Sequence, residues 1–237
     1  ETDTFGASPL RLKEFNFSKF DSSDLKAIPE SLDLKTCSLE SLTLQLNIEG
    51  CRIAQRAVEK YRAQPDYDGR PLFVAGSIGP SNYVVSSTEA NLNKGTFDQI
   101  VENFYHQALG LIEGGADVLL IETQQDILET KAIIEGANKA FTEKNKKLPM
   151  IVQATVDVFS KMQIFNTDIH AAYTAVSGMG IDVFGINCNV GPDEMVATVE
   201  KLSRFCRHPI SVVPNAGQPI SEDGQTCYKL SPEAMAN

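Results

Sequence analysis

The sequence has 237 residues, of which 42% are hydrophobic and 22% charged, and its formal net charge is −10 with a pI near 4.8. Binding to a nucleic-acid backbone depends on clustered Lys and Arg, and this acidic chain has no basic stripe, so nucleic acid is not an expected partner. No apolar run approaches the roughly 18 residues of a membrane span, so a membrane is not an expected partner either.

The cysteines indicate the compartment. The chain has five, none of them in a C-x-x-C pair: Cys37, Cys51, Cys188, Cys206 and Cys227. An odd number at wide, irregular spacing does not resemble the disulfide framework of a secreted protein. We therefore expect a cytoplasmic protein whose thiols stay reduced.

The first 70 residues are the least regular part of the chain. Residues 1–5, ETDTF, resemble the end of a strand whose beginning is missing. Residues 38–64 predict a helix, because apolar side chains recur there at helical spacing. Between them, turn-forming residues and Pro29 mark residues 16–37 as an irregular insertion.

From residue 71 onward, strand-like segments alternate with helical patterns. The strand-like segments lie at 71–81, 117–124, 149–157, 182–191 and 209–217. Each is nearly continuous in apolar character, which is typical of parallel strands buried on both faces. Repeated strand–helix units of this kind predict an α/β fold with a parallel sheet.

The predicted helices carry clear start signals. They begin near residues 96, 126, 167, 192 and 231. Thr96 and Gln99 have the spacing of a capping box, and Asp126 has the side chain of an N-cap residue. Pro192 falls in the first turn of its helix, where a missing N–H costs nothing.

An open doubly wound sheet and a closed (βα)8 barrel both satisfy this alternation. The barrel is favoured because polar residues gather where the strands end, and in barrels these ends converge on one active site. The polar residues are Glu1 to Asp3, Ser77, Glu122, Thr155 with Asp157, Asn187 with Cys188, and Asn215. We therefore predict a TIM barrel whose strand ends surround one substrate.

Taken singly, these residues leave two interpretations open. Cys188 is either an inert core thiol or a reactive ligand, and its place just before a helix N-terminus favours the thiolate. Glu122 serves either in a structural ion pair or in binding a ligand ammonium, because a lone buried carboxylate needs a partner. Asn187 and Asn215 either hold turns or contact a ligand.

Five motifs carry a resemblance to a known family. They are ETDTFGAS, GSIGPSN, EGGADVLLIET, GINCNVGPDEM and PNAGQP. In order and approximate spacing they resemble the homocysteine S-methyltransferase family over most of the chain outside the insertion. NCxxGPDE followed by PNAGxP is most similar to one branch, the homocysteine-binding barrels of cobalamin-dependent methionine synthases.

The resemblance implies a fold and a set of site residues. Residues 1–237 would form one homocysteine-binding (βα)8 barrel that is truncated, with its first strand and its last strand and helix missing. Family members bind zinc through three cysteine thiolates; Cys188 matches the first, and the other two are expected beyond Asn237. The residues expected at the substrate are Glu122, on the homocysteine amino group, with Asn187, Asp3 and Asn215 lining or supporting the site, and Ser77 from the ring of strand ends.

The resemblance also implies an activity. A zinc-bound homocysteine thiolate would accept the methyl group of methylcobalamin and become methionine, with no catalytic residue beyond the zinc-activated substrate thiol. The expected partners are homocysteine and the pterin- and cobalamin-binding modules of the same parent chain. We expect this chain alone to be inactive, because catalytic zinc needs three protein ligands and one open position.

Three alternatives remain at this point. The first is a cobalamin-independent homocysteine or thiol S-methyltransferase that takes its methyl group from a sulfonium, betaine or folate-linked donor. The second is a catalytically incomplete barrel that binds a small molecule. The third is an unrelated barrel lyase with Glu122 as general base, which requires a carboxyl pKa raised toward neutrality.

Overall fold

The computed structural model describes residues 1–17, 36–87, 95–217, 219–222 and 224–236. Most of the predicted insertion at 16–37 lies outside these residues. Within the described ranges, no helix is both long enough and apolar enough to cross a lipid bilayer.

Five parallel strands form one sheet, and their spatial order follows the chain. They are β1 (Ala75–Ile78), β2 (Val118–Gln124), β3 (Met150–Ala154), β4 (Val183–Asn187) and β5 (Ile210–Val213). A helix lies between each strand and the next, so the predicted α/β fold with a parallel sheet is confirmed. In the part of the chain that is described the sheet is open, since β1 and β5 do not pair, and a closed barrel is not observed.

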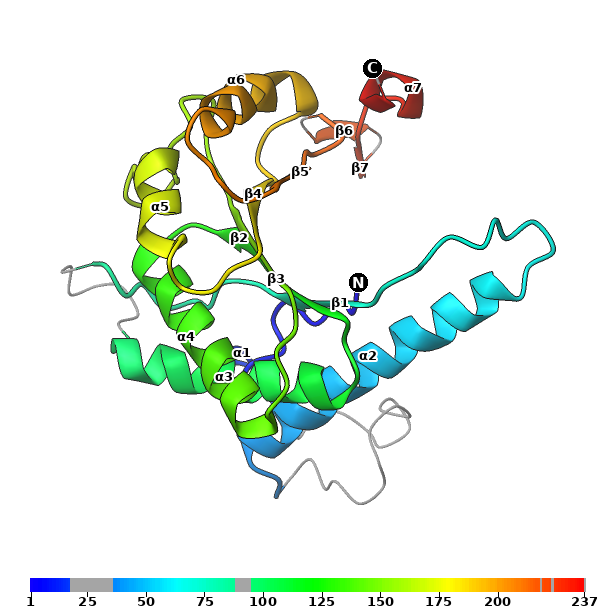
Figure 1. Cartoon of the computed structure of the whole chain (residues 1–237), viewed down its shortest axis with the longest axis vertical. Helices are drawn as coiled ribbons and strands as arrows, with labels where there is room; N and C mark the ends of the chain where they lie inside the picture. The colour runs from blue at the N-terminus through cyan, green and yellow to red at the C-terminus, as the bar shows by residue number, and fades with distance from the viewer. Residues whose placement is uncertain (18–35, 88–94, 218, 223, 237) are drawn as a thin grey trace.

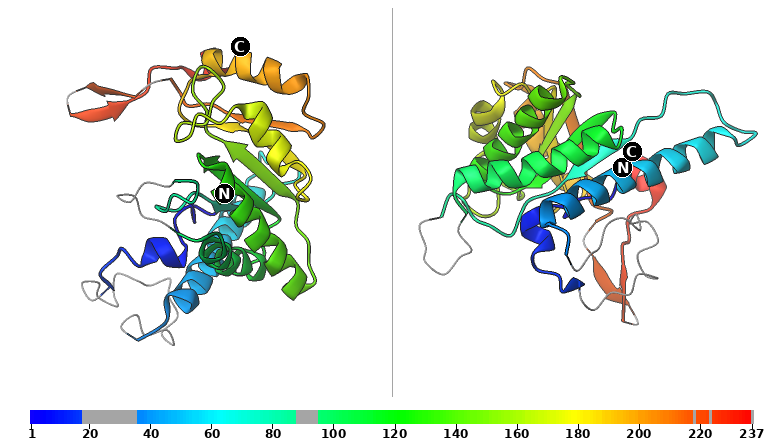
Figure 2. Two further views of the ribbon diagram at one scale, coloured as in Figure 1. Left: turned by 90° about the vertical axis from the view of Figure 1, so that its left-hand side faces the viewer. Right: turned by 90° about the horizontal axis from the view of Figure 1, so that it is seen from below.

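The larger helices surround this sheet. They are α2 (Leu39–Arg62), α3 (Phe97–Glu113), α4 (Ile127–Lys144), α5 (Ile169–Val176) and α6 (Pro192–Ser203). Figure 1 shows that the sheet curves and that α3, α4, α5 and α6 lie along its outer side. Helix α2 runs beside α3, as Figure 2 also shows.

The predicted helix starts are confirmed. The Thr96 side chain and the Gln99 backbone and side chain form a complete capping box at the start of α3. The Asp126 carboxylate accepts a hydrogen bond from the Leu128 N–H at the start of α4, and Pro192 opens α6. These contacts satisfy N–H groups that the first turn of a helix leaves without a partner.

The N-terminal residues run alongside β1 in the parallel direction. The Thr2 N–H donates to the Ala75 carbonyl at 3.0 Å, and the Gly79 N–H donates to the Phe5 carbonyl at 3.0 Å. Buried amides from the helices hold the same segment, since Gln107 of α3 donates to the Thr4 carbonyl at 2.7 Å. Residues 1–5 thus lie beside β1 through these hydrogen bonds, but they are not assigned as a strand, so the strand end predicted there is not observed.

The hydrophobic core lies between the sheet and the helices. In β2, Leu119 and Ile121 are 0% exposed and face the helices. The alternate residues, Leu120 and Glu122, are only half-buried and face the inner side of the curved sheet. The prediction that every strand is buried on both faces therefore holds only in part for β2, whose inner face is half-buried.

Three short elements were not predicted. They are α1 (Pro9–Leu12) and the antiparallel hairpin of β6 (Ile220–Glu222) with β7 (Gln225–Cys227). Figures 1 and 2 show the hairpin projecting from the rest of the chain, before α7 (Pro232–Ala236). Its turn contains Gly224 at φ +76°, and the Asp-Gly dipeptide in the sequence was the signal for it.

Candidate functional site

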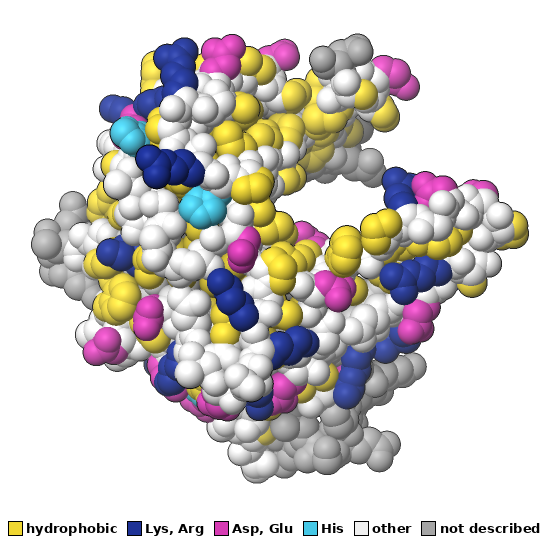
Figure 3. All heavy atoms as spheres, viewed as in Figure 1, with side chains coloured by type: hydrophobic (Ala, Val, Ile, Leu, Met, Phe, Trp, Pro, Cys, Tyr) yellow, Lys and Arg dark blue, Asp and Glu magenta, His cyan; other side chains and the backbone are white. Residues whose placement is uncertain are grey.

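Two predicted site residues meet at the carboxyl ends of β1 and β2. The Ser77 hydroxyl donates a hydrogen bond to Glu122 Oε1 at 2.6 Å. Ser77 is fully buried, and Glu122 is half-buried on the inner face of the sheet. Figure 3 shows a hollow on this side of the molecule, between α2 and the β6–β7 hairpin, with Asp and Glu side chains on its inner wall.

The electrostatics around Glu122 favour a cationic ligand. Burial raises the pKa of the Glu122 carboxyl, the Ser77 hydrogen bond opposes this, and the nearby carboxylates of Glu1 and Asp3 raise the pKa further, while the Glu1 amino group lowers it. No Lys, Arg or His of the described chain forms a salt bridge with Glu122. The structural ion pair considered from the sequence is therefore not observed. An incoming ammonium would supply the missing positive charge.

Glu122 is followed by a strained residue. Thr123 has φ +60°, which is unusual for a β-branched side chain, and the β2–β3 register shifts between Ile121 and Gln124. Asn187, at the end of β4, holds this conformation from across β3. Its Oδ1 accepts from the Thr123 N–H at 2.8 Å, and its Nδ2 donates to Thr123 Oγ1 at 2.8 Å. Asn187 is thus a clamp on the strand end that carries Glu122; direct contact with a substrate stays a prediction.

Cys188 follows this clamp residue directly. It is half-buried, has φ +63°, and donates its backbone N–H to the Val213 carbonyl at 3.0 Å. The thiol thus belongs to a turn at the same edge of the sheet as Glu122. Cys188 and Glu122 are linked through their chain neighbours Asn187 and Thr123, which share two hydrogen bonds.

The remaining two candidates occupy the two sides of this edge. Asp3 is exposed, has φ +54°, and acts electrostatically on Glu122. Asn215 is half-buried and donates its backbone N–H to the Val190 carbonyl at 3.0 Å, beside the turn that carries Cys188. The structure therefore groups Asp3 with Ser77 and Glu122, and Asn215 with Cys188.

The described residues do not by themselves fit a zinc ion. No three His, Cys, Asp or Glu side chains in the described ranges are placed to hold a metal. Cys188 offers one thiol at the strand-end edge. Cys51 offers none there, because it is fully buried in α2 and burial raises its pKa to about 11.

Glu129, three residues after the N-cap Asp126, was not among the predicted site residues. In the structure it is 3% exposed and accepts two hydrogen bonds from Ser81, in the loop after β1. Burial raises its pKa to about 7. Thr123 was missed entirely, because no sequence signal marks a threonine with positive φ.

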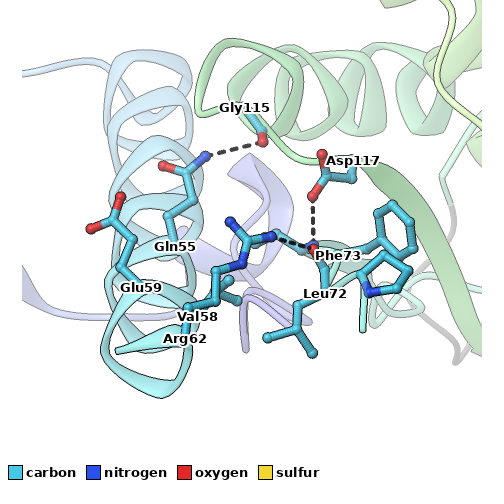
Figure 4. Close-up of a pocket in the computed structure, with 10 residues that line it drawn as sticks. Gln55, Val58, Glu59, Arg62, Leu72, Phe73, Gly115 and Asp117 are labelled. Carbon is cyan, nitrogen blue, oxygen red and sulfur yellow. Dashed lines mark hydrogen bonds between the residues drawn. The ribbon is translucent and has the colours of Figure 1, made fainter. Parts of the chain in front are cut away.

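A separate pocket of about 350 Å³ lies at the opposite, amino-terminal end of β1 and β2. Gln55 of α2 donates to the Gly115 carbonyl at 3.1 Å, and Arg62 donates to the Leu72 carbonyl at 3.2 Å (Figure 4). The Asp117 carboxylate accepts from the backbone ahead of β1. These polar groups join α2 to the chain that enters the sheet, so we assign this pocket a structural role.

Comparisons with known proteins point to one family. The family model described as homocysteine S-methyltransferase matches residues 1–237. Methionine synthase of Mycobacterium tuberculosis is 36% identical over 191 residues, which cover 81% of this chain and 15% of that protein. Methionine synthase of Mycobacterium leprae is 34% identical over 191 residues, with the same coverage. The chain thus spans about 15% of the length of these curated relatives.

Solved structures show the same fold. The oxidized form of the homocysteine methyltransferase MmuM from Escherichia coli superimposes with a TM-score of 0.65 at 20% identity, covering 91% of this chain and 65% of that chain. Its metallated form gives a TM-score of 0.62 at 21% identity, covering 82% and 66%. Because the family model matches all 237 residues of this chain, the chain belongs to the homocysteine S-methyltransferase family.

Proposed function

We propose that residues 1–237 are a homocysteine-binding domain of a cobalamin-dependent methionine synthase, which transfers a methyl group to the homocysteine thiol and forms methionine. Membership of the family and the identity to two mycobacterial methionine synthases support this assignment. Because the chain spans only 15% of those relatives, the pterin- and cobalamin-binding modules of the parent protein belong to the proposal as its partners. The five free cysteines fit a reducing cytoplasm.

One observation carries the substrate assignment. Glu122 is a half-buried carboxylate that Ser77 orients and that no Lys, Arg or His of the described chain neutralises in a salt bridge. Asp3 adds a second negative charge nearby. An amino-acid ammonium placed there gains charge pairing in a partly desolvated site, where such pairing is stronger than in water.

The thiol end of the substrate would lie toward Cys188 and Asn215. Asn187 sets the spacing between the two ends, because its side chain holds Thr123 while its backbone precedes Cys188. Both ends lie at the carboxyl edge of the same parallel sheet, where α/β folds place their ligands. The residues of this chain therefore bind and orient homocysteine.

Zinc and methylcobalamin enter this proposal through the family resemblance. Cys188 would supply one thiolate to the zinc, and the other two cysteine ligands would lie beyond Asn237. A bound zinc ion would lower the pKa of the substrate thiol, and methylcobalamin would carry the methyl group on a separate module. We also propose that β1–β5 are an arc of a (βα)8 barrel, which the superposition on MmuM supports.

Two alternatives have a specific observation in their favour. The solved relatives are named homocysteine methyltransferase, which fits a cobalamin-independent enzyme with another methyl donor. A small-molecule-binding barrel without catalysis fits the lack of a metal-holding group among the described side chains. Neither alternative changes the role proposed for Glu122 if the ligand is an amino acid.

The Glu122→Gln variant tests the proposal. We expect homocysteine affinity, measured by titration calorimetry on the parent protein, to fall roughly 30-fold, because loss of one partner of a partly buried charge pair costs about 2 kcal/mol. Glu135→Gln, an exposed position on α4, is the control and should bind as the wild type does. Equal affinity of Glu122→Gln and the wild type would overturn the assignment.

A further inference from the structure

The loop that follows β1, residues 79–86, is attached to the first turn of α4 through two carboxylates. Asp126 Oδ2 accepts hydrogen bonds from the Val85 N–H at 3.1 Å and the Ser86 N–H at 3.0 Å. Asp126 Oδ1 accepts from the Ser86 hydroxyl and, as the helix N-cap, from the Leu128 N–H. The loop is thus anchored at its far end to the helix that follows β2.

Glu129 anchors the near end of the same loop. Its Oε1 accepts from the Ser81 N–H at 2.8 Å and from the Ser81 hydroxyl. The side chain is 3% exposed, and no basic residue of the described chain forms a salt bridge with it. Asp126 is the charged group that acts on it.

The two anchors bear on the substrate site through a short stretch of chain. Ser81 follows Ser77 by four residues, and Ser77 orients Glu122. Glu122 and Glu129 belong to the same β2–α4 unit. This unit therefore bonds to the end of β1 through Glu122 and Ser77, and to the loop after β1 through Glu129 and Ser81. A loop released from Glu129 would free the chain that leaves β1 four residues after Ser77.

We propose that Glu129 is a positioning residue for the substrate site, which holds the loop 79–86 against the first turn of α4, its closed state, and releases it when Glu129 ionises. The proposal deepens the proposed function and rests on it for the identity of the ligand, while the loop contacts stand independently. When Glu129 is ionised in the closed loop, a buried carboxylate lies beside Asp126 without a cation, which is unfavourable. Opening the loop exposes this carboxylate to water and removes the cost.

The direction of the pH effect follows from the burial. Burial raises the pKa of Glu129 to about 7, the Ser81 hydrogen bonds lower it, and Asp126 raises it. The closed loop therefore favours the protonated carboxyl. The stabilisation of the closed loop is fully present below the ordinary glutamate pKa of about 4.5 and is lost as the pH rises to about 7. Between pH 5 and pH 8 the opening equilibrium should increase on the order of a hundredfold.

Amide hydrogen exchange on the parent protein tests this directly. After correction for intrinsic exchange rates, protection of peptides covering residues 79–86 should fall on the order of a hundredfold between pH 5 and pH 8 in the wild type. In Glu129→Gln, which keeps an acceptor for Ser81 but does not titrate, this fall should disappear. Glu135→Gln is the matched control on the same helix and should keep the wild-type pH dependence. The same fall in Glu129→Gln and the wild type would overturn the proposal.

A second arm tests the connection to the substrate. At pH 8, homocysteine at a hundred times its Kd should raise the protection of the loop about a hundredfold if the open loop does not bind it. Unchanged protection at saturation would overturn the positioning role. If no homocysteine binds at all, the proposed function fails, while the pH arm still decides the role of Glu129 in the loop.

Discussion

The carboxyl ends of β1 and β2 are held differently from the carboxyl ends of β4 and β5. At the β1–β2 end, Ser77 is fully buried and bonds to Glu122, and Asn187 clamps the residue after Glu122. At the β4–β5 end, Cys188 and Asn215 are half-buried and fixed by backbone hydrogen bonds. The proposed amino-group end of the site is thus preorganised by side chains, whereas the thiol end is a turn.

The difference follows from how each end is packed. Strand β1 has β2 on one side and the N-terminal segment on the other, with α3 packed behind it. In the described chain β5 pairs only with β4, and Val212 and Val213 of β5 are 39% and 53% exposed. Side-chain hydrogen bonds hold a precise geometry only where packing excludes water and alternative rotamers.

The largest loss of stability at the β4–β5 pair is expected from a substitution of Gly185. A Cβ at this position would lie 1.9 Å from the Ser211 carbonyl oxygen, in the neighbouring strand. We expect Gly185→Ala to lower the free energy of unfolding by about 3 kcal/mol or more, because backbone cannot yield as a flexible side chain does. Urea denaturation measures the change. Gly178→Ala, where a Cβ meets nothing within 4 Å, should be nearly neutral, and equal stability of both variants contradicts the prediction.

The hydrogen bonds between Asn187 and Thr123, which connect the ends of β4 and β2, are the next target. Asn187→Ala should lower the free energy of unfolding by about 1–3 kcal/mol, because it leaves the Thr123 N–H without its acceptor. Homocysteine affinity should fall with it, since Glu122 loses its fixed neighbour. A double-mutant cycle with Thr123→Ala isolates the bond from Asn187 Nδ2 to Thr123 Oγ1, because the Thr123 N–H remains in both Thr123 variants, and we expect a coupling free energy of about 1 kcal/mol. Strict additivity of the two substitutions would show that this side-chain bond contributes nothing.

The smallest effect on stability is expected at Cys188. Cys188→Ser should change the free energy of unfolding by less than about 0.5 kcal/mol, as is usual for a half-exposed position. The thiol should nevertheless be accessible. At pH 8, a pKa of about 11 leaves Cys51 only on the order of one part in a thousand as thiolate. Iodoacetamide should therefore label Cys188 at least about a hundredfold faster than Cys51 by peptide mass spectrometry, and comparable rates would place Cys188 in a closed core.

Local sequence signals predicted the order of elements well. The Thr96–Gln99 capping box, the Asp126 N-cap and the Pro192 helix start depend on residues within one turn, and the structure confirms each. The strand cores were found as well, although β1 covers only Ala75–Ile78 of the predicted 71–81. The projecting hairpin was missed because short, exposed strands carry little apolar pattern.

By itself, the sequence determined the repeated strand–helix units and which polar residues end the strands, because period, capping and chain order are local properties. Only the tertiary structure decided that Ser77 bonds to Glu122, that Asn187 bonds to Thr123, and that Glu129 grips Ser81. These pairs are far apart in the chain, and their contact depends on strand register and helix packing. No spacing in the sequence encodes that geometry, since it arises only when the whole sheet and its helices assemble.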